Sequence, residues 1–281
     1  MKKAISIWAF PADWELARCG QLAHEAGFEG IELAYAEEGP IHPQLSSVEA
    51  GRIRAELEKQ GLAVASLATG VLWRYNLLSP DARERAMAKE HIRTMLRLAA
   101  DLGTDCILVV PGFVGPFEAG APVVEDYEAA YASALADLRE LAQDAQRSRV
   151  HIGVENVWNR FLTSPLEMRE FVDAVASPYV GVYFDVGNVL RTSYPQHWIR
   201  ILGQRIRRVH FKDFRIAVGT LQGFVDLLEG DVDYPAVMAA LREVGYDGWL
   251  TAELFARPRY PEAVIFRASS DMDYILRGGE A

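Results

Sequence analysis

Cysteine is nearly missing from this chain of 281 residues, which contains only Cys19 and Cys106. Cys19 falls in a helix-like pattern and Cys106 in an apolar run, so we interpret both as reduced packing residues. This excludes a disulfide framework. It also argues against a structural zinc site, because such sites are commonly built from pairs of cysteines.

Positive charge is scarce as well. Lys and Arg number 29 against 39 Asp and Glu, which gives a net charge of -10. A phosphate backbone would be repelled by this chain unless a basic patch existed locally. The densest basic cluster, Arg205, Arg207 and Arg208, only flanks one predicted strand. We therefore expect no nucleic-acid partner.

Long hydrophobic runs are absent too, since no segment approaches the roughly 18 apolar residues of a membrane span. The N-terminal stretch MKKAISIWAFPADW resembles a signal peptide only briefly, because Pro11 and Asp13 break its short apolar run. We interpret it as a first strand. The sequence predicts no membrane partner and a cytoplasmic location.

Half of the residues are hydrophobic, and they gather in short runs that alternate with helix-period segments. The runs predict strands at 4–8, 30–34, 63–68, 105–110, 150–155, 180–184, 207–212 and 249–253. The segments between them predict helices at 13–26, 47–60, 81–102, 126–147, 165–176, 234–244 and 261–276. This α/β alternation favours a single (β/α)₈ TIM barrel that spans residues 1–281 as one domain. The alternative, a doubly wound open sheet, usually carries a Gly-rich phosphate turn after its first strand, and WAFPADWE has none.

The connections between these elements differ in length on the two faces of the predicted barrel. Short turns lead from helix to strand, and glycines at positions 27, 61, 103 and 245 are placed as left-handed helix C-caps. The connections from strand to helix are longer at 69–80, 111–124 and 217–233. Long loops at the C-terminal strand ends indicate the functional face.

Four apolar runs end in, or contain, a metal-binding residue type. VHIGVENVWN contains Glu155, VGVYFDVGN contains Asp185, RRVHFKD contains His210 and GWLTAEL contains Glu253. Without a cation, three carboxylates at one point would repel one another. Mostly oxygen ligands with one nitrogen favour one Mn²⁺ or Mg²⁺ ion, with Co²⁺ and Zn²⁺ as further options.

Motifs along nearly the whole chain carry a resemblance to a known family. They are GFEGIEL at 27–33, LAADLGTDCILVVPG at 98–112, IGVEN at 152–156, FDVGN at 184–188, VHFKD at 209–213, LLEGDVDY at 227–234 and GYDGWLTAEL at 245–254. Together and in this order they resemble the xylose isomerase-like TIM-barrel family of sugar and sugar-phosphate isomerases and epimerases. The resemblance implies that Glu155, Asp185, His210 and Glu253 bind the metal. It also implies that Glu155 and Glu253 are the catalytic proton-transfer pair.

FDVGN, together with FLTS at 161–164, looks closest to the ketose or pentulose-5-phosphate 3-epimerases. Many epimerases of the family have a substrate-contacting His three residues after the metal-binding Asp, where this chain has Asn188. An Asn can donate a hydrogen bond to a sugar oxygen, but it cannot carry a proton.

Other candidate substrate contacts lie at or beyond the strand ends. Lys212 lies two residues after His210 and so on the same side of that strand. Arg257 follows the eighth strand, where barrels often bind phosphate. The remaining candidates are Arg215, Glu32, Trp8, Trp73 and Trp158. For each of them, packing or a solvated strand end is an equally good interpretation, and for Arg257 a solvated loop position is the simpler one.

The sequence therefore predicts a metal-dependent ketose or ketose-phosphate 3-epimerase or isomerase that works through an enediolate, with a phosphorylated substrate preferred. The open alternatives are a dehydratase of sugar- or inositol-derived ketones, a hydroxypyruvate-type isomerase, and a barrel that binds sugar without turnover. An abasic-site endonuclease is a remote alternative, because it would need more strand-end histidines and a basic face. The oligomeric state is left open, with a homo-oligomer allowed.

Overall fold

The structure, a computed structural model, describes residues 1–115 and 125–278. The part of the predicted loop 111–124 that covers 116–124 lies outside the described residues. Within the described ranges, no helix is long and apolar enough to cross a membrane.

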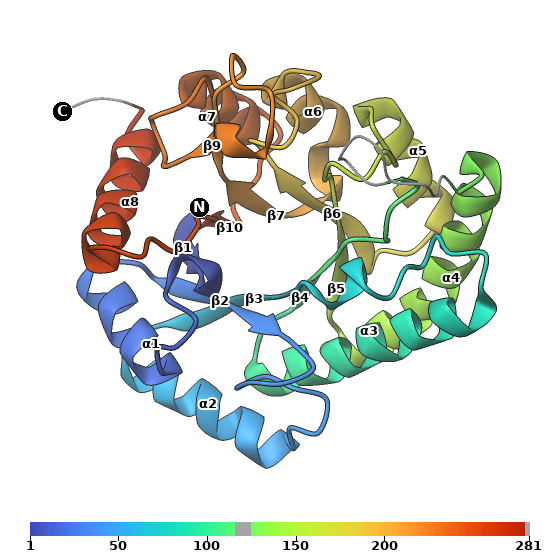
Figure 1. Cartoon of the computed structure of the whole chain (residues 1–281), viewed down its shortest axis with the longest axis horizontal. Coiled ribbons are helices and arrows are strands. Elements are labelled where there is room, and N and C mark those ends of the chain that lie inside the picture. Colours follow the sequence, from blue (N-terminus) through green and yellow to red (C-terminus); the bar gives the residue numbers. More distant parts are fainter. Residues whose placement is uncertain (116–124, 279–281) are drawn as a thin grey trace.

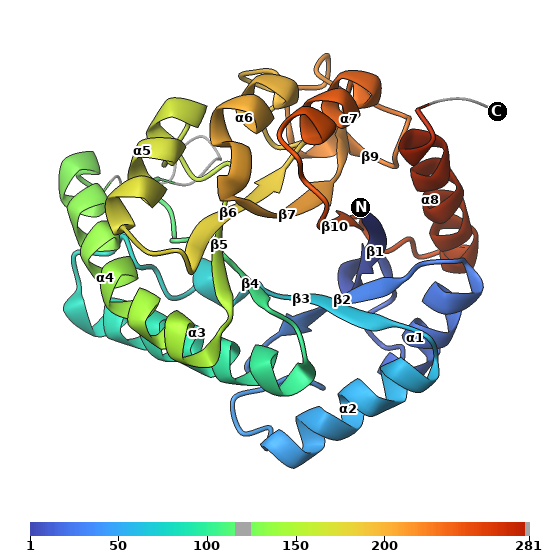
Figure 2. The same cartoon turned by 180° about the vertical axis from the view of Figure 1, so that it is seen from behind.

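Eight strands close into a barrel, and every neighbouring pair in it is parallel (Figures 1 and 2). Around the ring they are β1 (Lys2–Ser6), β10 (Trp249–Ala252), β7 (Ile206–Phe211), β6 (Val180–Asp185), β5 (His151–Glu155), β4 (Cys106–Val109), β3 (Ala63–Thr69) and β2 (Gly30–Tyr35). Strands of a parallel barrel are buried on both faces, which is why their sequences are nearly continuous apolar runs. The predicted (β/α)₈ barrel is confirmed.

Helices surround this ring on the outside (Figure 1). In the described residues they are α1 (Leu16–Glu25), α2 (Ser47–Lys59), α3 (Ala82–Leu102), α4 (Tyr127–Ser148), α5 (Pro165–Val175), α6 (Pro195–Leu202), α7 (Tyr234–Glu243) and α8 (Pro261–Leu276). The four glycines predicted as C-caps have positive φ angles between 70° and 90°, so these turns are confirmed.

Two features escape the sequence pattern. Helix α6 has eight residues, which is only about two turns and too short to show a helical period. The predicted loop 217–233 contributes β9 (Phe224–Val225), which pairs in antiparallel fashion with β8 (Asp213–Phe214). This small hairpin continues the chain beyond β7 over the C-terminal end of the barrel.

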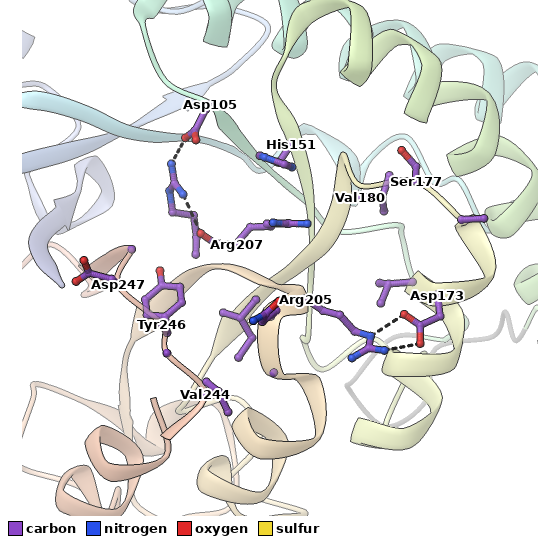
Figure 3. A pocket seen from close by; sticks show the side chains of 18 residues that line it. Asp105, His151, Asp173, Ser177, Val180, Arg205, Arg207, Val244, Tyr246 and Asp247 are labelled. Atoms are coloured by element: carbon purple, nitrogen blue, oxygen red, sulfur yellow. Dashed lines mark hydrogen bonds and ion pairs between the residues drawn. The ribbon is translucent and has the colours of Figure 1, made fainter. Parts of the chain in front are cut away.

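The N-terminal end of the barrel holds the arginine cluster and a cavity of about 790 Å³ (Figure 3). Arg208 is buried; its Nε donates to the Ala65 carbonyl oxygen at 2.9 Å, and its guanidinium also pairs with Asp105. Arg205 holds both carboxylate oxygens of Asp173, at 2.6 and 2.7 Å. Arg208 thus fastens β7 to β3 by a hydrogen bond and to the residue before β4 by an ion pair, and Arg205, directly before β7, is fastened to α5. The cluster therefore has a structural explanation.

Candidate metal centre

The four side chains predicted as metal ligands come together at the C-terminal end of the barrel. Glu155 and Asp185 are the last residues of β5 and β6. His210 lies one residue before the end of β7, and Glu253 directly follows β10. One ligand atom from each of the four lies within 4.8 Å of the others. Because β5, β6, β7 and β10 are consecutive around the ring, one half of the barrel supplies the whole set.

Asn156 fixes two of these strand ends relative to each other. Its side chain donates to the Asp185 carbonyl oxygen at 2.8 Å and accepts from the Asp185 N–H at 2.9 Å. The N–H of Asn188 then donates to Asp185 Oδ1 at 2.7 Å, which leaves Oδ2 for the centre. Sequence reasoning missed this role of Asn156. The available signal was an amide residue directly after a strand-terminal acid.

His210 lies between carboxylates on both sides of its ring. Nε2 is 3.0 and 3.1 Å from the two oxygens of Glu32. On the other side, Nδ1 is 3.3 Å from Glu155 Oε1 and 3.4 Å from Glu253 Oε2. In the neutral imidazole, a proton on Nε2 donates to Glu32 and leaves the lone pair of Nδ1 facing the other carboxylates.

Glu32, a predicted substrate contact, lies beneath His210 instead. It is completely buried and does not line the cavity described below. Tyr183 and Ser66 donate to its Oε2 at 2.5 and 2.7 Å. Burial raises the pKa of Glu32, but His210 outweighs this effect and the pKa is lowered. Glu32 is therefore an ionised, fully hydrogen-bonded partner that orients the imidazole.

Lys212 is the cation of the centre. Its ammonium contacts Glu253 Oε2 and lies 3.4 Å from Asp185 Oδ2. The side chain is mostly buried. Burial alone would lower the pKa of Lys212, but the carboxylates of Asp185 and Glu253 raise it, so the ammonium stays charged.

The carboxylates of the centre are crowded. Burial raises the pKa of Glu155 to about 7 and that of Asp185 to about 6, and the charge of Glu253 adds to both shifts. For Glu253, burial also acts upward, but Lys212 and then His210 outweigh it and lower its pKa to about 2. Asp185 Oδ2 is buried and accepts no hydrogen bond from the described residues, with the Lys212 ammonium 3.4 Å away. This buried oxygen, beside two further carboxylates and an imidazole nitrogen, fits a divalent cation.

A cavity of about 590 Å³ opens above the centre, and Glu155, Glu253 and Lys212 form its floor. Of the predicted substrate contacts, Trp8, Trp73, Trp158, Asn188 and Lys212 line this cavity. The side-chain amide of Asn188 donates to the Asn156 carbonyl oxygen at 2.9 Å.

Two predicted substrate contacts lie outside the residues that line the cavity. Arg215 donates from Nε to the Glu229 carbonyl oxygen at 2.9 Å. Arg257 pairs with Asp226 at 3.0 Å. Both acids belong to the segment between β7 and α7, so each arginine is held by that loop. The apolar lining was missed by sequence reasoning, because a loop Phe or Leu carries no chemical signal; it includes Phe113, Leu221, Phe224 and Phe255.

Comparison with known proteins identifies the class. The sequence pattern of the xylose isomerase-like TIM barrel family matches residues 21–273, and the chain belongs to this family. It is 27% identical over 242 residues to a putative L-ribulose-5-phosphate 3-epimerase of Escherichia coli K12, covering 83% of this chain and 82% of that protein.

Solved structures agree with this fold. D-psicose 3-epimerase of Clostridium cellulolyticum H10 superposes with a TM-score of 0.80 at 20% identity over the full length of both chains. A 3-keto-D-glucoside 4-epimerase of E. coli superposes with a TM-score of 0.78 at 17% identity over 98% of each chain.

Proposed function

We propose that this protein is a divalent-metal-dependent ketose 3-epimerase. The proposal is carried by the convergence of Glu155, Asp185, His210 and Glu253 on one point, with their ligand atoms within 4.8 Å of one another. The relatives named for 3-epimerisation of L-ribulose 5-phosphate and D-psicose support the reaction type.

Oxygens of Glu155, Asp185 and Glu253 and the Nδ1 atom of His210 would hold the cation. Three carboxylates and the one ammonium of Lys212 leave a formal charge of minus two at the centre, and Glu32 behind His210 adds a further negative charge, so the centre favours a divalent cation. When bound, the ion supplies a Lewis acid that polarises the ketose carbonyl and stabilises the charge of an enediolate.

Glu155 and Glu253 act as the proton-transfer pair. β6 and β7 lie between their strands, so the two carboxylates reach a ligand at the centre from different directions. One carboxylate removes the proton from carbon 3 on one face, and the other returns a proton to the opposite face. Transfer on opposite faces inverts that carbon, whereas transfer on a single face would favour moving the carbonyl.

A metal-reconstitution assay tests the site. Protein stripped with a chelator is supplied with Mn²⁺, Mg²⁺, Co²⁺ or Zn²⁺ and assayed on free pentuloses and hexuloses and their phosphates, with product analysis by NMR. We expect C3 epimers only after metal is restored. Release of water or a 1,2-shift of the carbonyl as the main reaction would instead support the dehydratase or isomerase alternatives.

A second experiment tests the two bases. Glu155→Gln and Glu253→Gln should each lower kcat by roughly 10²-fold or more, in line with the loss of general acid–base catalysis. Glu170→Gln, at an exposed residue of α5, is the matched control. Turnover in D₂O should place deuterium at carbon 3. Product free of deuterium even at early conversion would contradict the two-base mechanism.

A further inference from the structure

The cavity above the metal centre has aromatic walls on opposite sides of the barrel ring. Trp73 follows β3 and Phe113 follows β4, and their rings stack with centroids 6.5 Å apart. Across the ring, Phe224 lies in β9 beyond β7 and Phe255 follows β10, with centroids 6.4 Å apart. Trp158 continues the second wall, 4.9 Å from Phe224. All five line the same cavity as Glu155 and Glu253.

The outer part of these walls is open to solvent. Trp73 is 45% exposed, Leu221 48% and Phe255 63%. Large apolar side chains gathered around the mouth of a site indicate that an apolar group is bound there. We call Trp73, Leu221 and Phe255 the rim of the cavity. The rim belongs to the same cavity as Glu155 and Glu253, so a ligand that reaches these carboxylates also contacts the rim.

Cations for a phosphate group are missing from the described lining. Lys212 supplies its one cationic side chain, and this ammonium already faces Asp185 and Glu253. Residues 116–124, PFEAGAPVV, contain no Lys, Arg or His. Arg160 and Arg191 line a neighbouring cavity of about 230 Å³ that shares Val157, Trp158 and Asn188 with the main one, and neither arginine is among the lining residues of the main cavity.

Charge balance leads to the same conclusion. With a divalent ion in place, the three carboxylates, Lys212 and the ionised Glu32 behind His210 sum to a formal charge of minus one. A phosphate dianion at the far end of a ketose would find no unpaired cation among the described residues of the lining, and it would lose water against apolar walls without compensation, which is unfavourable. These charges favour a substrate whose far end is uncharged.

We propose that the substrate is an unphosphorylated ketose whose end remote from the metal is apolar, either deoxygenated or joined to an aryl or alkyl group. This rests on the ketose epimerase function proposed above. The ketose oxygens would face the carboxylate floor, and the apolar end would pack between Trp73 and Phe255. A volume of about 590 Å³ falls in the range of roughly 300–1,000 Å³ that holds ligands larger than a monosaccharide.

A panel on one sugar skeleton tests the proposal. The Mn²⁺-loaded enzyme is assayed on a ketohexose, its 6-phosphate and its 6-O-benzyl ether. We expect kcat/KM for the benzyl ether to exceed that of the parent sugar by about tenfold or more, as one well-filled apolar contact provides. The phosphate should be the poorest of the three. A phosphate that matches or surpasses the parent sugar overturns the proposal.

Substitutions at the rim test whether it causes the preference for the benzyl ether. Trp73→Ala and Phe255→Ala should remove most of the benzyl advantage, mainly through KM, with a smaller loss on the parent sugar. Phe266→Ala on α8, an exposed residue outside the cavity lining, is the matched control and should leave the preference unchanged. Equal losses on both sugars, or no loss on either, contradict a rim that binds the apolar end.

Two further measurements separate the remaining outcomes. If no ketose is turned over, the proposed reaction fails, and tryptophan fluorescence titration with the benzyl ether and the phosphate still tests binding. Tighter binding of the ether then supports the apolar site on its own, and tighter binding of the phosphate refutes it. Light scattering of Trp73→Ala and Phe255→Ala tests the other occupant: loss of a dimer in both would show that the rim joins two copies of the chain.

Discussion

Replacing Glu32 with Gln should weaken metal binding although Glu32 cannot reach the metal site itself. Glu32 lies on the far side of the imidazole, with its oxygens 3.0 and 3.1 Å from Nε2 of His210. Gln keeps the shape and one acceptor, but it removes the negative charge that makes the imidazole a stronger ligand. The substitution therefore separates charge from packing.

The expected size of the effect follows from the geometry. Carboxylates that accept from a metal-binding histidine typically contribute 10- to 100-fold to metal affinity, which is about 1.4–2.8 kcal/mol. Tyr183→Phe removes only one of the donors to Glu32 and leaves its charge, so its effect should be smaller than tenfold. Glu32→Ala would also break the buried pair with His210, and should destabilise the fold by roughly 3–5 kcal/mol.

Mn²⁺ affinity is measured by electron paramagnetic resonance of the free ion during titration, with thermal unfolding of the metal-free protein as the control for folding. Glu32→Gln with a wild-type unfolding midpoint and at least tenfold weaker Mn²⁺ binding would support the role. A folded Glu32→Gln protein whose Mn²⁺ affinity lies within twofold of wild type would refute it.

Three more predictions concern the same centre. Lys212→Met should destabilise the metal-free protein by roughly 3–5 kcal/mol, because buried carboxylates lose their cation. Saturating Mn²⁺ should restore part of the lost stability, which is measured by calorimetry of thermal unfolding. The metal-free protein should lose stability as pH rises from about 4.5 to 7: folded Glu155, with its pKa raised to about 7, keeps a proton that the unfolded chain releases near 4.5. The loss, roughly 3 kcal/mol from this group, is measured by urea midpoints and should shrink with Mn²⁺. Gly187→Ala should lower kcat/KM more than tenfold, since a Cβ there would lie 2.7 Å from the Lys212 carbonyl oxygen, whereas Gly51→Ala, with open space around it, should leave kcat/KM unchanged.

The barrel strands were predictable because burial on both faces turns each of them into an apolar run. The first strand shows the limit: the expected range 4–8 became Lys2–Ser6, and Ile7–Ala9 forms a 3₁₀ turn. The apolar run continues through both elements, so hydrophobicity alone could not locate the boundary.

The four metal-site residues could be chosen from the sequence because each lies at or within one residue of a strand end. The position of Glu32 beneath His210 could not be predicted, because Glu32 lies in the middle of β2 and not at its end. In the barrel, Glu32 pairs in register with Ser66, and His210 lies level with Asp185 and Thr251 on the other side of the ring. The stagger of the strands decides which inward side chains meet across the barrel interior. This stagger cannot be predicted from a single sequence.

Two of the predicted substrate contacts, Arg215 and Arg257, do not line the cavity, for a different reason. Arg215 and Arg257 follow β7 and β10, where a phosphate site is expected in a barrel. However, the segment between β7 and α7 also contains Asp226 and Glu229, and each arginine is held there. In a chain with 39 acidic and 29 basic residues, an arginine near a strand end has many protein carboxylates to pair with, as Arg215 does with Glu229 and Arg257 with Asp226. Acidic residues of neighbouring loops compete with a phosphate group for such an arginine. A strand-end arginine therefore predicts a phosphate site only where these acids pair with other residues.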